Sequence, residues 1–307
     1  MINKILNHKS FKNNPPVIID LGASGETYNK WKDIYPQSVF VALDGDKREK
    51  IKKKHKFKKY IQINKIIFKK KTNKLFYFTK SPYCSSLLKP IYKKNKEWFF
   101  HNSFKIIKTT KIKTVTVKEI IYKNKIEGID IMKIDLQGID LDILKSLPKK
   151  LKENIKYIDI EPSMYGFYRG EKNNVSEILK YMQKDYSIED IAFGKHIKGD
   201  IRKIENYSNL KKKLIYFCNK KSISYMNICF IKKFKNHKNV RDTLMYLCIL
   251  LINRRYSEVY DILDMTNNKD PIFNEIKSFC DNKLNFSLIT YILFLPLIIF
   301  KKLLKKI

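Results

Sequence analysis

Four acidic residues, Asp20, Asp44, Asp135 and Glu161, each follow a short apolar run of the sequence. Short runs of apolar and β-branched residues are typical of strands buried in a parallel sheet. The carboxyl ends of parallel strands meet at one edge of the sheet, and ligands bind at that edge. We therefore expect the four carboxylates to lie close together in or around a binding site.

The first of these strands leads into a glycine-containing turn, Asp20-Leu-Gly22-Ala23-Ser-Gly25. Gly22 would allow the backbone to approach a ligand closely, and Gly25 can adopt conformations that bulkier residues avoid. Asp44 ends the next strand, where a carboxylate can accept hydrogen bonds from both hydroxyls of an adenosine ribose. We interpret these residues as a candidate cofactor-binding set. The alternative is a structural turn of an ordinary α/β protein.

The sequence of this turn indicates which kind of cofactor it could bind. The full Gly-x-Gly-x-x-Gly pattern is absent, and the acidic Glu26 follows the turn directly. A pyrophosphate needs N–H donors and positive potential at that place, which disfavours a dinucleotide. S-adenosylmethionine carries a ribose and a positive sulfonium but no phosphate, so it suits an acidic turn better.

Several blocks of the sequence resemble the FkbM-type methyltransferases, over roughly residues 17–231. The most specific block is Lys-Ile-Asp-x-Gln-Gly-x-Asp/Glu, and Ser85-Ser86-Leu87 is similar to a Ser-Ser-Leu loop of the family. The other matching blocks are Asp20-Leu-Gly-Ala, Val41-Ala-Leu-Asp44, Lys133-Ile-Asp135-Leu-Gln-Gly138-Ile-Asp140 and Ile158-Asp-Ile-Glu161-Pro-Ser.

The resemblance implies a class I Rossmann-like fold, S-adenosyl-L-methionine as the methyl donor, and a hydroxyl acceptor on a sugar or polyketide. The sequence departs from the family pattern at three places. Its Gly-Ala-x-Gly turn is one residue tighter than the commoner spacing, Asp44-Gly-Asp stands where Glu-Pro is more usual, and Asp140 replaces a frequent glutamate.

Methyl transfer from a sulfonium is an in-line displacement, which depends mainly on alignment and is helped by a general base. Asp135 ends the strand nearest the expected methyl position and is our candidate base. Lys133 precedes it by two residues, so both lie on one face of the strand and can form an ion pair. Glu161 could bind the acceptor or share the role of base. Alternatively, Asp135 is a structural acid that caps the helix after Gly138.

Strands alternate with helices along most of the chain, which predicts a mostly parallel sheet covered on both faces, with one antiparallel strand. We expect a Rossmann-like domain at 1–235, a helical hairpin at 236–285 and an apolar, basic tail at 286–307. The predicted strands are 17–20, 38–43, 58–63, 66–70, 74–78, 111–117, 129–134, 155–160, 186–192 and 225–231, and the predicted helices are 27–35, 47–55, 138–147, 175–182, 241–253 and 256–265.

The chain is strongly basic, with 64 Lys and Arg against 30 Asp and Glu and a net charge of +34 over 307 residues. Lysine, asparagine and isoleucine are all over-used, which is explained by an A/T-rich genome. The alternative is attraction to a polyanion, either nucleic acid or an anionic membrane. Only six of the 64 basic residues are arginine, the side chain that nucleic-acid sites favour, so the composition argues against nucleic acid.

The five cysteines are scattered without a Cys-x-x-Cys pair, which favours a reducing, cytoplasmic environment. The first residues lack the apolar core of a signal peptide. The histidines show no ligand-like spacing, so we predict no metal site. Asp135, Asp140 and Glu161 remain as an alternative set of cation ligands.

Residues 286–300 are largely apolar and lead into Lys301-Lys-Leu-Leu-Lys-Lys-Ile307. This segment is short for a membrane span, and Pro296 interrupts it. An apolar segment with a lysine-rich end suits an anchor on an anionic membrane surface. The alternative is a C-terminal helix packed against the protein.

Together these observations predict a cytoplasmic O-methyltransferase, peripheral on the inner membrane through its tail, that acts on a hydroxyl of a sugar or glycolipid. Two alternatives stay open. One is a non-catalytic membrane-surface protein on a methyltransferase scaffold, and the other is a nucleic-acid methyltransferase. Asn14-Pro-Pro-Val17 is similar to a motif of nucleic-acid enzymes, but it precedes the first strand instead of following the fourth.

Overall fold

The computed structural model describes residues 1–24, 27–48, 55–199, 207–235, 239–266 and 269–304. The chain divides into two compact units. The larger unit is Pro15–Lys233, and the smaller unit combines Met1–Asn14 with Phe234–Ile307. The predicted boundary at residue 235 lies close to this division, but the first 14 residues, which we had assigned to the larger domain, belong to the smaller unit.

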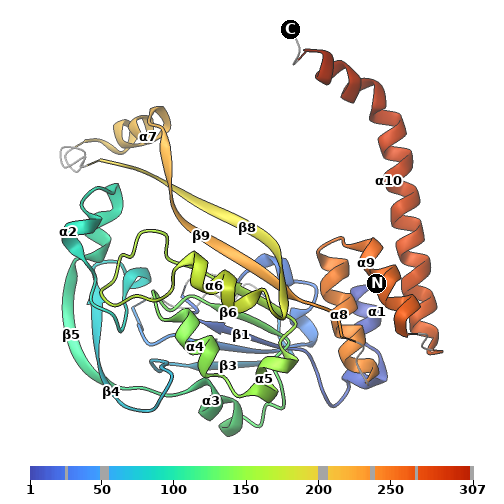
Figure 1. Ribbon diagram of the computed structural model, residues 1–307, viewed down its shortest axis with the longest axis horizontal. Helices are drawn as coiled ribbons and strands as arrows, with labels where there is room; N and C mark the ends of the chain where they lie inside the picture. Colours follow the sequence, from blue (N-terminus) through green and yellow to red (C-terminus); the bar gives the residue numbers. More distant parts are fainter. Residues whose placement is uncertain (25–26, 49–54, 200–206, 236–238, 267–268, 305–307) are drawn as a thin grey trace. The chain divides into compact units, whose positions relative to one another are not determined.

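The larger unit is built on a seven-stranded sheet in the order β3-β2-β1-β6-β7-β9-β8 (Figure 1). The first five strands of this order run parallel, and β9 is antiparallel to both of its neighbours. The predicted α/β sheet with one antiparallel strand is therefore confirmed. The strands are β1 Val17–Leu21, β2 Val39–Leu43, β3 Lys59–Ile63, β6 Ile131–Ile134, β7 Tyr157–Ile160, β8 Tyr186–Ile197 and β9 Lys221–Lys232.

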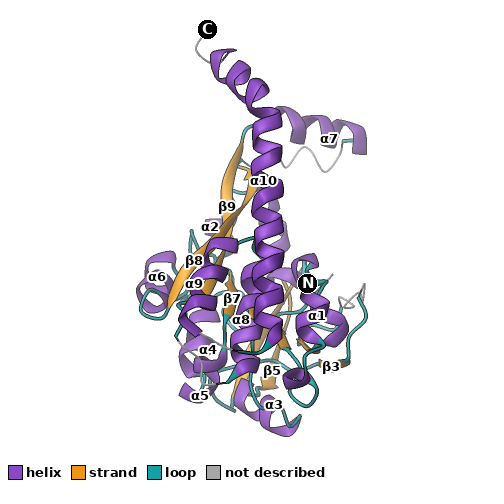
Figure 2. Cartoon of the chain, turned by 90° about the vertical axis from the view of Figure 1, so that its right-hand side faces the viewer, coloured by secondary structure: helices purple, strands orange, loops and turns teal. Residues whose placement is uncertain are grey.

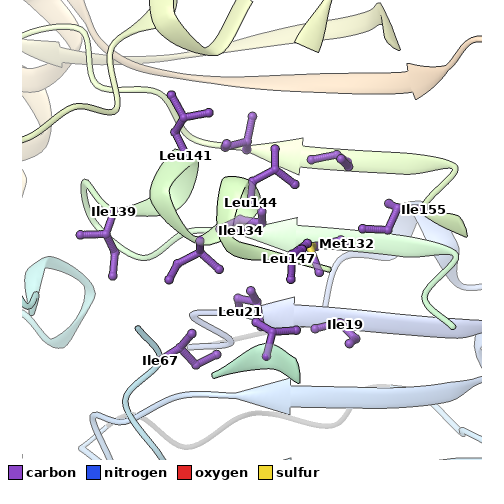
Figure 3. Close-up of a cluster of buried hydrophobic side chains, with 14 of the residues drawn as sticks. Ile19, Leu21, Ile67, Met132, Ile134, Ile139, Leu141, Leu144, Leu147 and Ile155 are labelled. Carbon is purple, nitrogen blue, oxygen red and sulfur yellow. The ribbon is translucent and has the colours of Figure 1, made fainter. Parts of the chain in front are cut away.

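One face of the sheet carries the aliphatic core (Figure 3). Ile19 and Leu21 of β1 and Met132 and Ile134 of β6 alternate along their strands toward this face, and they are fully buried. Amphipathic helices supply the opposing side chains, such as Leu141 and Leu144. These helices are α3 Val117–Lys123, α4 Asp140–Ser146, α5 Lys149–Asn154 and α6 Val175–Met182.

The other face is covered by aromatic residues on two short 3₁₀ turns, Asn29–Trp31 and Tyr35–Gln37. The Trp31 ring meets the Tyr157 ring edge-on at 4.8 Å between centroids, and Lys30 Nζ donates to the Tyr157 hydroxyl at 2.5 Å. The helix predicted at 27–35 is therefore wrong. The Tyr35 hydroxyl donates to the carbonyl of Tyr28, whose backbone is extended, so tertiary contacts fix turns here in place of a helix.

Two other predicted elements differ from the structure. Residues 66–70 form only an isolated bridge between Ile67 and Val115. The strand predicted at 111–117 is β5, Ile106–Lys113, and Val117 already begins α3. The helix predicted at 47–55 falls largely on residues 49–54, which lie outside the described residues.

Between β3 and β6 the chain forms a separate two-stranded ribbon of β4 (Asn73–Thr79) and β5. The loop between these strands contains two short 3₁₀ segments, Pro82–Cys84 and Phe99–Phe104, and a single turn of helix, α2 Tyr92–Asn95. Further along, β8 and β9 extend beyond the sheet as a long antiparallel arm that ends near helix α7, Asn209–Cys218 (Figures 1 and 2).

The smaller unit is helical and consists of α1 Ile2–Leu6, α8 Val240–Ile252, α9 Tyr256–Thr266 and α10 Pro271–Leu304. Lys4 pairs with Glu275 at 2.7 Å and His8 contacts Asp270 at 3.0 Å, so the N-terminal segment is tied to α10 and to the residue just before it. The apolar segment predicted as a tail continues α10 as helix through Leu304. Among the described residues, no helix combines the length and the apolar character that crossing a bilayer requires.

Candidate active site

The order of the strands reverses between β1 and β6, and the candidate residues lie where these strands and their neighbours end. Gly22 follows β1, Asp44 follows β2, Asp135 follows β6 and Glu161 follows β7. All four strands are parallel, so the residues lie at the same edge of the sheet. Asp20, by contrast, lies inside β1 because this strand runs one residue further than predicted.

Gly22 is required by the close approach of β1 and β6. Its φ is +85°, and a side-chain Cβ at this position would lie 1.9 Å from the carbonyl oxygen of Asp135. Its N–H and that of Ala23 both donate to the carbonyl of Leu43, which ties the turn to the end of β2. Only glycine satisfies both constraints, so the protein's own backbone explains this residue without a ligand.

A pocket of about 560 Å³ opens at this edge. Its floor is formed by Gly22 and the residues after β2 and β6, and its far wall is formed by the loop after β4. Among the described residues, the charged ones that line it are three aspartates, Asp44, Asp46 and Asp135, and one lysine, Lys65. The pocket is therefore acidic although the whole chain has a net charge of +34.

Asp44 and Asp46 play different parts in this pocket. Asp46 is held by Arg48 through both of its carboxylate oxygens and accepts a hydrogen bond from Ser85 Oγ at 2.8 Å. These donors keep the pKa of Asp46 below its ordinary value, although burial opposes this. Asp44 accepts from the Asp46 N–H at 2.7 Å, and burial together with the nearby acids raises the pKa of Asp44 to about 6.

Asp135 is oriented by its neighbours. Gln137 Nε2 donates to Asp135 Oδ1 at 2.8 Å, and the Tyr168 hydroxyl donates to Gln137 Oε1 at 2.7 Å. Gln137 adopts a left-handed conformation with φ of 54°, and its carbonyl accepts a hydrogen bond from Ser86 Oγ. The Ser85-Ser86 pair therefore supports both sides of the pocket, through Asp46 and through Gln137.

The predicted pair of Lys133 and Asp135 is present, but Lys133 has a nearer partner. Its Nζ lies 3.8 Å from Asp135 Oδ2 and 3.4 Å from Asp20 Oδ1. Asp20 stands opposite Lys133 in the sheet, and Asp159 follows on the other side. Burial opposes the charge of Lys133, but the surrounding carboxylates raise its pKa above the ordinary value. Lys133 thus neutralises a row of acids beneath the pocket.

Glu161 belongs to a second hollow, of about 330 Å³, which also contains Tyr168, Tyr225 and Phe167. Asp135 and Gln137 line both this hollow and the acidic pocket, so the two meet at these side chains. Burial, and then the charges of Asp135 and Asp140, raise the pKa of Glu161 well above its ordinary value.

Asp140 has a structural part in this arrangement. Its carboxylate is buried and accepts hydrogen bonds from the N–H groups of Leu136 and Gly138 and from Asn173 Nδ2. These contacts fix the loop that carries Asp135 and Gln137, although burial raises the pKa of Asp140 to about 8. Among the described residues, no group of three or more His, Cys, Asp or Glu side chains is arranged to hold a metal ion.

The structure thus brings Gly22, Asp44, Asp135 and Glu161 together, with Lys133 and Asp20 below them in the sheet. Ala23 is buried behind the turn, and Gly25 lies outside the described residues. Sequence reasoning missed the role of Gln137, although its position two residues after a strand-end acid is a usable signal. It also missed Asp46 with Arg48, and nothing in their spacing indicates the contact with Ser85.

Three comparisons place this site among known proteins. No curated protein matches the chain. Among solved structures, one described as "Structure of an antibiotic related Methyltransferase" is 12% identical over 75% of this chain and 92% of that chain, with a TM-score of 0.29, which is too low to carry an argument. Residues 47–188, which include Asp135 and Glu161, match the family model of the methyltransferase FkbM domain.

Proposed function

We propose that the protein is an S-adenosyl-L-methionine-dependent O-methyltransferase that acts on a hydroxyl of a sugar or glycolipid. The observation that carries this proposal is the acidic pocket, since three of the four charged residues that line its described part are aspartates, in a chain of net charge +34. An anionic cofactor would be repelled there, whereas a cofactor with a sulfonium and an ammonium group would be attracted.

The residues of the pocket fit this cofactor. Asp44 stands where its carboxylate can accept the ribose hydroxyls, while Asp46 is already occupied by Arg48 and Ser85. When bound, the cofactor would supply an electrophilic methyl group on a positively charged sulfur.

The acceptor would occupy the second hollow and meet the methyl group beside Asp135 and Gln137. The acceptor hydroxyl would receive the methyl group that the cofactor supplies, and its proton would pass to Glu161. Glu161 suits this role because its raised pKa makes the carboxylate a stronger base than an ordinary glutamate. Asp135, held by Gln137 and Lys133, would orient the hydroxyl and complement the sulfonium.

The lining of the second hollow supports a sugar as acceptor. Tyr225, Phe167 and Tyr168 offer aromatic surface for the C–H faces of a sugar ring, and Glu161 and Glu171 offer carboxylates to its hydroxyls. A hollow lined by three acids, Asp135, Glu161 and Glu171, is a poor match for the phosphates of a nucleic acid. This contrast favours a glycan over the nucleic-acid alternative.

We further propose that the protein acts in the cytoplasm at an anionic membrane surface, with α10 as one contact. Phe286, Ile289, Ile292, Leu293 and Phe294 are all more than half exposed and Leu295 is 36% exposed, and helical geometry distributes these six residues around the circumference of α10. A helix that is apolar on every side needs an apolar environment on every side, which lipid provides. The sequence after residue 300 is rich in lysine, a composition that anionic headgroups attract.

Methyl labelling tests the proposed activity. The protein is incubated with S-adenosylmethionine labelled in its methyl group and an extract of the source cells, which is then separated into polysaccharide, lipid, protein and nucleic-acid fractions. We expect label in the polysaccharide or lipid fraction, and none with Glu161→Gln. Label in nucleic acid would contradict the proposed acceptor, and absence of label from all fractions would contradict the activity.

A further inference from the structure

Helix α7 presents an exposed apolar stripe at the end of the arm formed by β8 and β9 (Figures 1 and 2). Leu210, Leu214 and Phe217 are 69%, 54% and 84% exposed. Their spacing of four and three residues places them on one side of the helix. Burying such a stripe would be favourable, so its exposure calls for an occupant.

The rest of α7 is arranged around this stripe. With 3.6 residues per turn, Lys211 and Lys213 lie on either side of the apolar stripe. The opposite side faces the protein, where the Tyr216 ring lies 6.4 Å from the Phe99 ring and Lys221 Nζ lies 4.2 Å from the Tyr216 ring. The outward orientation of Leu210, Leu214 and Phe217 is therefore set by contacts on the inner side.

We propose that α7 docks on an anionic membrane surface, with Leu210, Leu214 and Phe217 in the apolar layer and the flanking lysines among the headgroups. Leu and Phe on one side of a helix bordered by lysine are the pattern of an interfacial helix. A second copy of the chain is a poorer occupant. A symmetric contact through this stripe would bring Lys211 and Lys213 of both copies together, and like charges would repel.

The position of α7 gives this docking a consequence for the reaction. The arm carries Ser224 and Tyr225 of β9, which line the acceptor hollow. The 3₁₀ segment Phe99–Phe104 joins the arm to the loop after β7. Phe100 meets the His196 ring at 4.8 Å and the Phe167 ring at 5.9 Å, and Phe104 meets the Tyr168 ring at 5.7 Å. The membrane contact and the acceptor hollow therefore share one packed aromatic cluster.

This arrangement deepens the proposed function, on which it rests, by naming the acceptor class. Docked through α7, the enzyme holds its acceptor hollow next to the lipid surface. The acceptor is then a glycan still attached to a membrane lipid, and soluble free sugars are poorer substrates.

Fluorescence quenching tests the docking in the full-length protein. The two native tryptophans, Trp31 and Trp98, are 3% and 0% exposed, so they report little on the surface. Phe217→Trp places a reporter in the stripe. Tyr122→Trp is the matched control, because Tyr122 on α3 is 85% exposed, against 84% for Phe217, and both views show α3 far from α7. The probe is a vesicle of phosphatidylcholine and phosphatidylglycerol with brominated acyl chains.

Because the apolar side of an interfacial helix sinks about 5–10 Å into the membrane, we expect roughly half of the added emission of Phe217→Trp to be quenched. Tyr122→Trp should keep its emission. Equal quenching of both variants, or no quenching of Phe217→Trp, would overturn the proposal. The proposal would also be overturned if a soluble acidic protein bound to the stripe and abolished the quenching of Phe217→Trp by the vesicles. Calorimetry with S-adenosylmethionine on the same Phe217→Trp protein reports separately on the cofactor site, so failure of the docking is distinguishable from failure of the methyltransferase assignment.

Discussion

At the scale of single residues, the site gathers carboxylates that would repel one another in the absence of a nearby cation. Lys133 offsets part of this repulsion from below, at 3.4 Å from Asp20 and 3.8 Å from Asp135. The acids that line the pockets still differ in environment. Arg48 keeps Asp46 charged, whereas burial raises the pKa values of Asp44 and Glu161. These differences assign separate roles to chemically similar groups.

The raised pKa of Asp44 predicts how cofactor binding depends on pH. A carboxylate accepts hydrogen bonds from both ribose hydroxyls, whereas the protonated acid loses part of that capacity. Affinity for S-adenosylmethionine should therefore be full above pH 7 and should fall as the pH drops through about 6, where Asp44 takes up a proton in the free protein. Calorimetric titrations between pH 5 and 8 measure this. An affinity that stays constant across the range would contradict the assigned role of Asp44.

Glu161 makes a prediction about the rate. As general base it must be ionised, and its pKa is raised, so kcat should increase with pH beyond the range in which glutamate ordinarily titrates. Glu161→Gln should lower kcat by about 10²–10⁴-fold and should abolish the increase of kcat with pH, while binding of S-adenosylmethionine changes little. Asp135→Asn serves as the comparison, because Asp135 lines both pockets and its loss should weaken binding as well. A Glu161→Gln variant with a wild-type pH–rate profile would refute this assignment.

At the scale of elements, the turn after β1 and the loop after β6 have to cross at van der Waals distance to form the edge of the pocket. Gly22 permits this crossing, since a Cβ there would lie 1.9 Å from the Asp135 carbonyl oxygen. Gly170 offers a matched comparison. Its φ is also positive, +70°, but nothing lies within 4 Å of where its Cβ would be.

Alanine substitutions at these two glycines therefore distinguish the cost of backbone strain, which both share, from the cost of a steric clash, which only Gly22 has. Gly170→Ala should lower the free energy of unfolding by about 1 kcal/mol, the cost of a left-handed conformation for a residue with a side chain. Gly22→Ala should lower it by about 3 kcal/mol or more, because β1 and β6 must also move apart. Urea unfolding of both variants gives the comparison. Equal losses would show that the crossing of β1 and β6 tolerates a side chain.

The elements that sequence patterns predicted well are those with a fully buried surface. The apolar runs before Asp44, Asp135 and Glu161 are buried strands that end within a residue of the predicted position. Short continuous apolar runs of this kind are typical of strands buried inside a sheet. The segment 27–35 is predicted as a helix because it follows the first strand and is stopped by Pro36. In the structure Trp31 packs on Tyr157, a long-range contact that local spacing does not reveal, and the Tyr35 hydroxyl donates to the Tyr28 carbonyl.

The sequence predicts only part of the arm formed by β8 and β9. The sequence indicated strands at 186–192 and 225–231, but β8 extends to Ile197 and β9 begins at Lys221. Along β8 almost every side chain is exposed or half-buried, so this strand shows no alternation of burial that a pattern could reveal. Helix α7 was not predicted, although Leu210, Leu214 and Phe217 recur at helical spacing.

At the scale of the whole molecule, an acidic site is carried by a basic chain. The net charge of +34 would draw the protein to anionic surfaces, while the pocket itself remains negative. The composition alone leaves the acceptor class open. The folded chain adds the information that the acidic residues gather at the pocket. That distribution could not be predicted, because carboxylates far apart in sequence meet only at the sheet edge.

This distribution predicts that the chain co-sediments with anionic vesicles and that binding weakens as salt rises. Removing residues 286–307 should lower the bound fraction severalfold, because it deletes the exposed apolar half of α10. Folding should survive, since the buried side chains of α10, including Ile276 and Cys280, precede the deletion. Cosedimentation at two salt concentrations and a thermal melt provide the measurement. Unchanged binding after truncation would contradict the proposed contact of α10.

The measurement that tests the central claim most directly is calorimetric binding of S-adenosylmethionine and S-adenosylhomocysteine to the full chain and to Asp44→Asn. We expect micromolar binding of both ligands to the wild type, with the positively charged S-adenosylmethionine favoured by the acidic pocket. The affinity of Asp44→Asn should be lower by about tenfold or more, in line with removal of a charged hydrogen-bond acceptor. Absence of binding to folded wild-type protein, or equal affinity of the variant, would contradict the assignment of this pocket as the cofactor site.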